Sequence, residues 1–367
     1  MVCTRGTRLI KLRGSVHVDD LGEAMAKEGG DTVKEARRKF RALLKRKKLT
    51  VMPGGFSPLY ARLAQEAGFE CFFLPGSQLA HFLYGVPDNG ILGLSDLVDH
   101  ARHMAVHCDI PILVDADTGY GNAVNVHFAT EAIIRSGVAA LQIEDQEAPK
   151  KSGTAAGRRL IPVEEAVGKI KAAVAARDAL DPDFVICARC DGIGAEASNF
   201  DDTLRRCIAY VKEGGADLVW LNSVQSREQV RQACKAIPGP VLAIWGGEDA
   251  PPGWEEYEKL GLRIVLYPTI AATAGLQASW ELLNDLHRRG APALLDWNRR
   301  VKASPFGQPD VKKLLGYDMI REVERRFLPK SAQRDYATTF GHKTNFADAP
   351  ASPKPGRRAK PKTGELI

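Results

Sequence analysis

The sequence lacks any apolar run long enough to cross a membrane, so we expect no membrane-spanning segment and no membrane partner. Its first 13 residues carry scattered charges where a signal peptide would have an apolar core. Its 7 cysteines are an odd number, spread along the chain without the spacing of a small disulfide-stabilised protein. These absences predict a cytoplasmic protein whose thiols are reduced.

Two short motifs lack the feature that would make them functional. The turn from Gly119 to Gly121 has the first two glycines of a dinucleotide-binding loop but not the third, which favours a simple tight turn. The pair Cys187 and Cys190 has the spacing of a redox motif but straddles the end of a predicted strand instead of opening a helix. We therefore interpret both motifs as structural.

Basic residues are in modest excess, with a net charge of +6 that is concentrated in segments 34–48 and 354–362. Solvated helix faces and tails are a commoner source of such segments than nucleic-acid sites, and we expect no nucleic-acid partner. Phe40, Leu43 and Leu44 recur at helical spacing, which predicts a basic amphipathic helix laid across one end of the domain.

The centre of the chain alternates between strand and helix patterns eight times. Strands are predicted at 49–52, 71–74, 110–114, 139–143, 184–188, 217–221, 240–244 and 262–266. Helices are predicted at 58–67, 94–107, 124–136, 162–180, 201–213, 227–237, 254–260 and 270–289. This pattern favours the α/β class and a (β/α)8 TIM barrel, with a doubly wound open sheet as the alternative.

The flanks divide the chain further. We predict an N-terminal arm and basic helix over 1–45, the barrel over 46–290, C-terminal helices over 291–330 that include one amphipathic helix at 309–327, and a basic, disordered tail over 331–367.

Two carboxylates, Asp115 and Asp117, follow the predicted strand 110–114. Residues i and i+2 of a strand point to the same face, so the two side chains are expected to converge. Converging carboxylates are costly unless a cation or proton lies between them, and such oxygen ligands suit Mg²⁺. A solvated pair that caps a loop is the alternative for an isolated Asp-x-Asp.

Further polar residues follow the neighbouring strands, where the active sites of barrels lie. They are Asp88, Glu144, Lys150, Ser152 and Arg189. The acids predict a Mg²⁺ site, with Mn²⁺ as a possible substitute, and Arg189 has the planar guanidinium that clamps a carboxylate. The sequence therefore predicts a metal site facing a small-molecule carboxylate.

Five segments, taken in order, resemble the isocitrate lyase / phosphoenolpyruvate mutase superfamily. They are 85–88 (GVPD), 114–122 (VDADTGYGN), 142–146 (QIEDQ), 149–153 (PKKSG) and 188–191 (ARCD). The resemblance covers about 43–328 and is greatest to the short lyases that act on 2-methylisocitrate and 2,3-dimethylmalate. It implies a carbon–carbon lyase that cleaves a 2-hydroxy or 2-oxo (di)carboxylate through an enolate, and a homotetramer that exchanges its last helices, here about 309–327.

The resemblance also implies roles for individual residues. Asp117 would contact the metal directly, Asp115 and Glu144 would hold its waters, Asp88 would be a further acid nearby, and Arg189 would bind the substrate carboxylate. The turn formed by Pro75, Gly76 and Ser77 would bind that carboxylate through backbone N–H groups, although proline removes one donor. Lys150, Ser152 and Gly153 would lie on the mobile loop after the fourth strand.

Three positions depart from the superfamily pattern. Ser152 stands where the lyases have the cysteine that protonates the departing enolate, and a hydroxyl is a much weaker acid than a thiol. Asn222 and Trp245 follow strands where the lyases carry other polar residues, and Trp245 could line the pocket or pack in the core. These departures predict a changed substrate. They leave open an oxaloacetate-type decarboxylase or hydrolase, a phosphonopyruvate-type mutase or hydrolase, and a carboxylate-binding protein that is not an enzyme.

Overall fold

The computed structural model describes residues 18–336, with side chains from residue 32 onward. The predicted arm before residue 18 and the predicted tail beyond residue 336 lie outside the described residues. The chain divides into two compact units, Met1–Ala271 and Ala272–Ile367, and each is described by itself. No helix among the described residues is long and apolar enough to cross a membrane.

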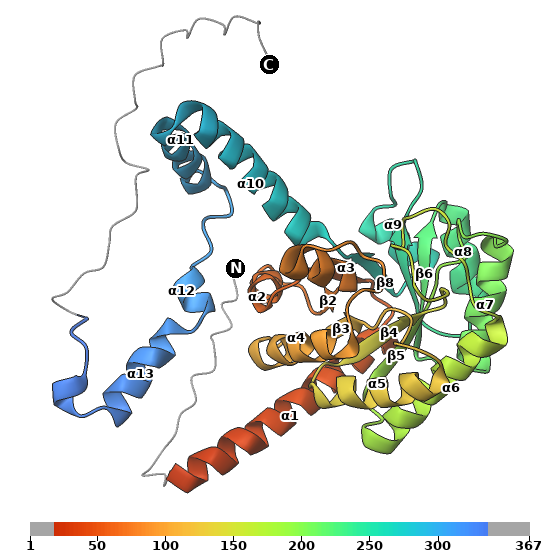
Figure 1. The fold of residues 1–367 in the computed structure, drawn as a ribbon, viewed down its shortest axis with the longest axis horizontal. Helices are drawn as coiled ribbons and strands as arrows, with labels where there is room; N and C mark the ends of the chain where they lie inside the picture. The colour runs from red at the N-terminus through yellow and green to blue at the C-terminus, as the bar shows by residue number, and fades with distance from the viewer. Residues whose placement is uncertain (1–17, 337–367) are drawn as a thin grey trace, which may run out of the picture. The chain divides into compact units, whose positions relative to one another are not determined.

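Eight parallel strands form the sheet of the first unit, in the order β1-β8-β7-β6-β5-β4-β3-β2 (Figure 1). They are β1 (Thr50–Pro53), β2 (Phe72–Leu74), β3 (Ile112–Asp115), β4 (Ala140–Glu144), β5 (Val185–Cys190), β6 (Leu218–Val224), β7 (Val241–Trp245) and β8 (Ile264–Tyr267). A single bridge between Gly54 and Phe73 joins β1 to β2 and brings the sheet round into a nearly closed barrel. The predicted (β/α)8 fold is confirmed.

Helices follow the strands and cover the outside of the sheet (Figure 1). They are α2 (Pro58–Glu66), α4 (Leu94–His107), α5 (Ala123–Arg135), α6 (Val163–Leu180), α7 (Phe200–Lys212), α8 (Arg227–Ala236) and α9 (Trp254–Leu260). Capping residues explain several starts: Ser57, Asn122, Asn199 and Ser226 each accept a hydrogen bond from a backbone N–H in the first turn of the helix that follows. The short helices α3 (Gly76–Leu79) and η1 (Ala80–Tyr84) were not expected from the sequence.

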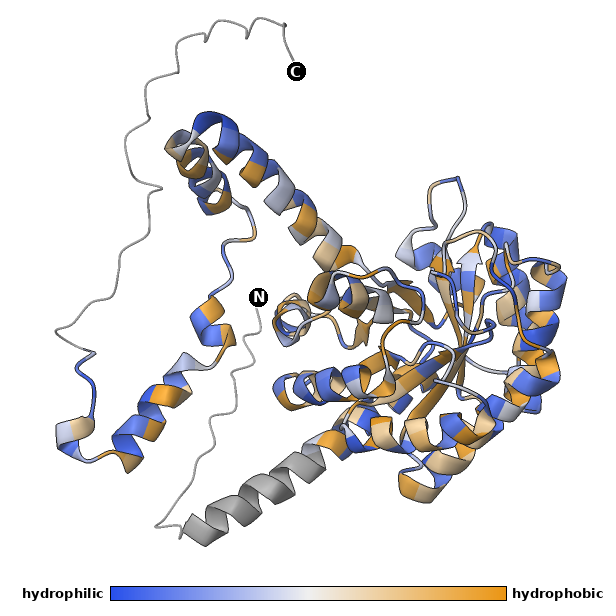
Figure 2. Ribbon diagram, in the orientation of Figure 1, coloured by the Kyte–Doolittle hydropathy of each residue, from blue (hydrophilic) through white to orange (hydrophobic). Residues whose placement is uncertain are grey.

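The apolar core has two layers, one inside the barrel and one between the sheet and the helices, and Figure 2 shows the strands as predominantly hydrophobic. Alternation along each strand sorts its residues between the layers. Leu113, Ala140 and Cys187 belong to the inner layer. Each of these strands carries a charged residue on the same side, nearer its carboxyl end: Asp115 follows Leu113 in β3, Glu144 follows Ala140 in β4, and Arg189 follows Cys187 in β5. The barrel interior therefore changes from apolar to charged at the carboxyl ends of the strands.

Helix α1 (Val18–Lys45) closes the opposite end of the barrel, as the basic amphipathic pattern predicted. Phe40, Leu43 and Leu44 join the inner apolar layer. Arg37 donates to the carbonyl oxygens of Ile134 and Val138 and pairs with Asp181 at 2.5 Å. Arginines of this helix are thus used to bind backbone that leads into the strands.

The second unit contains α10 (Ile270–Arg289), which begins at the end of the first unit, α11 (Ala291–Lys302), α12 (Val311–Leu314), α13 (Tyr317–Phe327) and the 3-10 turn η2 (Lys330–Ala332). The prediction of one helix over 309–327 was wrong. Gly316 adopts a left-handed conformation with φ of 75°, which interrupts the helix between α12 and α13. Helix α11 lies within the segment 291–330 that was predicted to be helical, although its bounds were not predicted.

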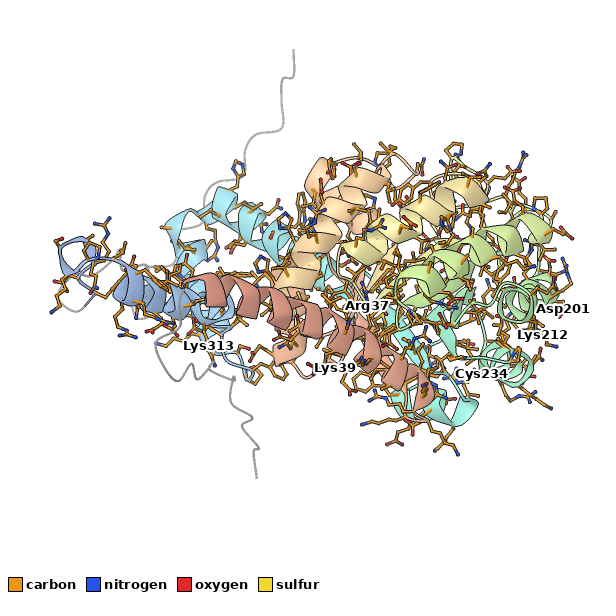
Figure 3. All side chains as sticks on the ribbon, turned by 90° about the horizontal axis from the view of Figure 1, so that it is seen from below. Arg37, Lys39, Asp201, Lys212, Cys234 and Lys313 are labelled. Atoms are coloured by element: carbon orange, nitrogen blue, oxygen red, sulfur yellow. The ribbon has the colours of Figure 1, made fainter. Side chains whose placement is uncertain are left out.

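We expect Arg37→Met to lower the free energy of unfolding by about 3 kcal/mol, because it leaves Asp181 and two buried carbonyl oxygens without their cationic partner. Lys39→Met is the matched control on the same helix (both residues are labelled in Figure 3), since Lys39 is exposed and, among the side chains that the structure describes, pairs with Glu35 alone, at 2.9 Å. Its effect should stay below about 0.5 kcal/mol. Urea unfolding followed by circular dichroism measures both; equal effects would contradict the role of Arg37.

Candidate active site

Asp115 and Asp117 come together at the end of β3, but not by strand alternation. Asp115 is the last residue of the strand, whereas Asp117 lies beyond it with a φ of 47°. The two converge because the N–H of Asp117 donates to the Asp115 carboxylate at 3.1 Å. Burial, and then the charge of Asp115, raise the pKa of Asp117 to about 6.

Lys150 provides the cation that these acids need. Its ammonium lies 2.5 Å from Oδ1 of Asp88 and 2.9 Å from Oδ1 of Asp117, and the side chain is almost fully buried. Burial alone would lower the pKa of Lys150, but the charges of Glu144, Asp117, Asp115 and Asp88 outweigh it and raise that pKa. Lys150 is therefore protonated and draws the loop after β4 onto the acids.

Arg189 is held at the end of β5 by two carboxylates. Its Nη1 lies 3.0 Å from Glu144, and its Nε and Nη2 donate to Asp191 at 2.8 and 3.0 Å. The guanidinium lies over the ring of Trp220, 4.6 Å from its centroid. Burial raises the pKa of Glu144 well above its usual value, and Arg189 only partly offsets this.

The turn before α3 lies against the two aspartates. The N–H of Gly76 donates to Oδ2 of Asp115 at 3.1 Å, so this donor is engaged by the protein itself. A Cβ on Gly76 would lie 3.2 Å from Asp117 and 3.4 Å from Asp115. Pro75 precedes the helix as its N-cap, and Ser77 lies in its first turn. The turn thus borders the acids, and of the N–H groups predicted to bind a substrate carboxylate, that of Gly76 binds Asp115 instead.

The loop after β4 is pinned at Gly153. Its carbonyl oxygen accepts hydrogen bonds from Asn222 at 2.8 Å and from Arg158 at 2.6 Å. A Cβ on Gly153 would lie 2.2 Å from Nη2 of Arg189, so only glycine fits this close approach. Ser152 lies between Lys150 and Gly153, and its carbonyl oxygen accepts the N–H of Ala155 at 2.8 Å.

Trp245 is not brought into this group. Ile244 packs against the inner apolar layer, whereas Trp245, the next residue in β7, packs against the outer one. The indole N–H donates to the carbonyl of Asp249 at 2.9 Å, and Arg227 lies over the ring at 5.7 Å. The ring is engaged by its own surroundings.

Three residues that touch the site were missed in the sequence: Trp220 below Arg189, Arg158 on Gly153, and Gln146, whose amide reaches Asp191 and Lys151. Alternation along β6 could have indicated Trp220, because it shares a face with Asn222. Gln146 lies in segment 142–146, which carried the resemblance, but no role was assigned to it, and no spacing pattern indicates Arg158.

The oxygen atoms at the site suit a metal cation. Oδ1 of Asp117 and Oε2 of Glu144 are buried and accept no hydrogen bond, although each lies within 3.0 Å of a cationic side chain. Among the described residues, no three acidic, His or Cys side chains are grouped closely enough to bind a metal by themselves. These two carboxylate oxygens, which accept no hydrogen bond, and the carboxylate of Asp115 are nevertheless the kind of oxygen donors that fit Mg²⁺, with water completing the coordination.

Comparison with known proteins identifies the family to which this chain belongs. Residues 40–287 match the model of the phosphoenolpyruvate phosphomutase family. The chain belongs to this family. It is 36% identical over 291 residues to 2,3-dimethylmalate lyase of Eubacterium barkeri, an alignment that covers 79% of this chain and 97% of that enzyme. It is also 35% identical over 252 residues to 2-methylisocitrate lyase of Aeropyrum pernix, covering 68% of this chain and 79% of that enzyme.

Solved structures of the family agree. A phosphoenolpyruvate phosphomutase from Streptomyces platensis subsp. rosaceus superposes with a TM-score of 0.72 at 31% identity, covering 80% of this chain and 100% of that one. Family relatives include lyases, mutases and hydrolases, so the chain is an enzyme of this superfamily, as the resemblance implied.

Without metal, the raised pKa of Asp117 should make Asp117→Asn stabilising in a pH-dependent way. Both states are protonated below about pH 4, and between about pH 4 and pH 6 the unfolded chain loses its proton first, so wild-type stability falls as pH rises through this range. The variant lacks this titration. In urea unfolding with a chelator present, we expect the free energy of unfolding of Asp117→Asn to exceed that of the wild type by more at pH 7 than at pH 4. A difference that does not change with pH would contradict the prediction.

Proposed function

We propose that this enzyme is a Mg²⁺-dependent carbon–carbon lyase that cleaves a 2-hydroxy or 2-oxo (di)carboxylate through an enolate, and that it acts in the cytoplasm. The observation that carries the proposal is the buried group of Asp88, Asp117, Lys150, Glu144 and Arg189 at one mouth of the barrel. Mg²⁺, or Mn²⁺ in its place, would be held by Asp115, Asp117 and Glu144 and would stabilise negative charge that develops on a substrate oxygen.

The protein's own groups would bind and orient the substrate. Arg189 is rigid, because Glu144 and Asp191 hold it over Trp220, and a fixed guanidinium suits a carboxylate. The turn of Pro75, Gly76 and Ser77 lies against Asp115 and Asp117 and would border that carboxylate, with Ser77 as its donor because Pro75 has no N–H and the N–H of Gly76 binds Asp115. Gly153 and Asn222 close the site from the loop side and exclude water.

The metal assignment is tested by a screen of 2-hydroxy and 2-oxo diacids for release of pyruvate, glyoxylate or succinate, with and without MgCl₂. We expect turnover that is abolished by a chelator and falls by a factor of about 10³ or more in Asp117→Ala. MgCl₂ should raise the melting temperature of the wild type but not of Asp117→Ala, a readout that needs no substrate. Asp99→Ala, at an exposed position on α4, should keep both properties. A metal response that persists without Asp117 would remove it as a ligand.

A hydrolase or decarboxylase acting on an oxaloacetate-like 2-oxo acid is the second candidate. An oxaloacetate acetylhydrolase superposes on this chain with a TM-score of 0.70 at 30% identity, covering 80% of this chain and 97% of that one. The observation that favours this candidate is Ser152, a poor acid where the lyases have a thiol. A phosphonopyruvate-type reaction is a further outcome of the same screen, since a phosphonopyruvate hydrolase superposes with a TM-score of 0.65.

Variants at residue 152 separate these chemistries. If the Ser152 hydroxyl donates the proton to an enolate, Ser152→Ala should lower kcat by a factor of about 10² or more with KM changed less, and Ser152→Cys should restore it. For decarboxylation or hydrolysis that does not use this group, kcat of Ser152→Ala stays within about threefold of the wild type. Product analysis by mass spectrometry identifies which reaction occurs.

We also propose a homotetramer that exchanges its C-terminal helices. Trp280 and Leu283 on α10 and Met319 and Phe327 on α13 are each more than half exposed in the second unit. Such large apolar side chains, repeated on two helices, indicate a surface that another chain covers. Native mass spectrometry should give a particle of four 40.0 kDa chains, and removal of residues 306–367 should reduce it to a smaller species. A full-length monomer would contradict this arrangement.

A further inference from the structure

Gln146 lies two residues beyond the end of β4 and is almost completely buried. Its Oε1 accepts the N–H of Lys151 at 3.0 Å, and its Nε2 donates to the carbonyl of the same residue at 3.1 Å. One side chain thus satisfies both backbone groups of Lys151, as a neighbouring strand would. The orientation of the amide follows from its partners, since the N–H of Lys151 needs an acceptor and the nearby carboxylates need a donor.

The loop that contains Lys151 is tied down on both sides of this contact. At its base, the N–H of Glu147 donates to the carbonyl of Arg159 at 2.8 Å, and Gln146 and Leu160 form an antiparallel bridge. Beyond Lys151, Asn222 and Arg158 hold the carbonyl of Gly153. Gln146 therefore fixes the middle of the segment that carries Lys150 and Ser152.

The same amide also reaches the group that holds Arg189. Nε2 of Gln146 donates to Oδ2 of Asp191 at 2.5 Å, and this oxygen also accepts Nη2 of Arg189 at 3.0 Å. A second carboxylate, Glu144, lies 3.3 Å from Nε2 and 3.0 Å from Nη1 of Arg189. Loop position and guanidinium orientation therefore depend on shared hydrogen bonds.

We propose that Gln146 is a positioning residue that couples closure of the loop over 147–159 to the orientation of Arg189. When the loop is closed, Lys150 reaches Asp88 and Asp117 while Asp191 is held for Arg189. When Lys151 leaves, the amide loses two of its partners and its hold on Asp191 loosens. The catalytic meaning of this coupling rests on the proposed function, but the coupling itself is measured without substrate.

The test is limited trypsin digestion of the full chain, with cleavage after Lys151 quantified by mass spectrometry. Cleavage of a folded loop follows the population of its open form. We expect Gln146→Met, which keeps the length but removes every hydrogen bond, to speed this cleavage at least about tenfold. The cleavage rate of Gln146→Glu should fall between those of the wild type and Gln146→Met. This variant keeps an acceptor for the Lys151 N–H but places a third carboxylate beside Glu144 and Asp191.

Gln65→Met is the matched control. The Gln65 amide makes the same kind of paired contact, donating to the Asp109 carboxylate at 3.0 Å and accepting the Asp109 N–H at 3.3 Å, but it lies on α2 at an exposed site. It should leave cleavage after Lys151 unchanged. The proposal is wrong if Gln146→Met is cleaved no faster than Gln65→Met.

A second readout addresses Arg189. Phenylglyoxal modifies accessible guanidinium groups, and Arg189 is only 6% exposed. If loop and arginine are coupled, Gln146→Met should increase modification of Arg189 together with loop cleavage, whereas an increase in cleavage alone would contradict the coupling. Should neither Gln146 variant fold, hydrogen exchange of the wild type decides, because the Lys151 amide must then exchange at least about tenfold more slowly than in an unstructured peptide. These measurements need no substrate, so they stand even if the proposed lyase activity is not found. The proposed function and the proposed coupling by Gln146 can therefore fail separately.

Discussion

Burial of like charges is the constraint on which the site depends. Five carboxyl groups, those of Asp88, Asp115, Asp117, Glu144 and Asp191, lie at one end of the barrel with two cationic partners, Lys150 and Arg189. Carboxylates removed from water are tolerated only when they are paired or protonated. The raised pKa values of Asp117 and Glu144 express the remaining imbalance. A divalent cation would relieve the same imbalance, which is the physical argument for the proposed metal.

Packing at the opposite end of the barrel offsets the destabilisation caused by these buried charges. Helix α1 inserts Phe40, Leu43 and Leu44 beneath the strands, and Arg37 binds backbone carbonyls and Asp181. There the charges are paired and the interior is apolar. Stability is concentrated at the amino ends of the strands and charge imbalance at the carboxyl ends, a division that barrel enzymes share. The charged group can therefore remain under strain without unfolding the domain.

The sequence predicted the parts of the site that depend on strand ends. Asp115, Glu144 and Arg189 follow apolar runs of strand length, and parallel strands bring their ends to one edge, so spacing alone predicted their meeting. Spacing did not predict that Asp117 reaches Asp115 through a positive φ, because that depends on the turn beyond the strand.

The structure decides the placement of two tryptophans, of which the sequence had left Trp245 open between the pocket and the core. Trp220 lies under Arg189, whereas Trp245 packs outside the sheet, and both follow from alternation once the register is known. The break at Gly316 was missed because apolar residues on both sides keep a helical spacing while the glycine turns the chain. Contacts made by Gln146 and Arg158 depend on the path of a loop and leave no periodic signal.

That loop explains how residue 152 can differ from the lyase pattern without loss of the closed site. The groups that hold the loop act on backbone atoms: Gln146 binds the N–H and carbonyl of Lys151, and Asn222 and Arg158 bind the carbonyl of Gly153. Lys150 is held through its own ammonium. None of these contacts uses the side chain of Ser152, so a thiol and a hydroxyl are equally compatible with closure. Gly153 is different, because its Cα lies against Arg189 and excludes any larger residue. Closure and the proposed proton donation therefore depend on different atoms of one loop, and residue 152 can change while Lys150, Gly153 and Arg189 keep their places.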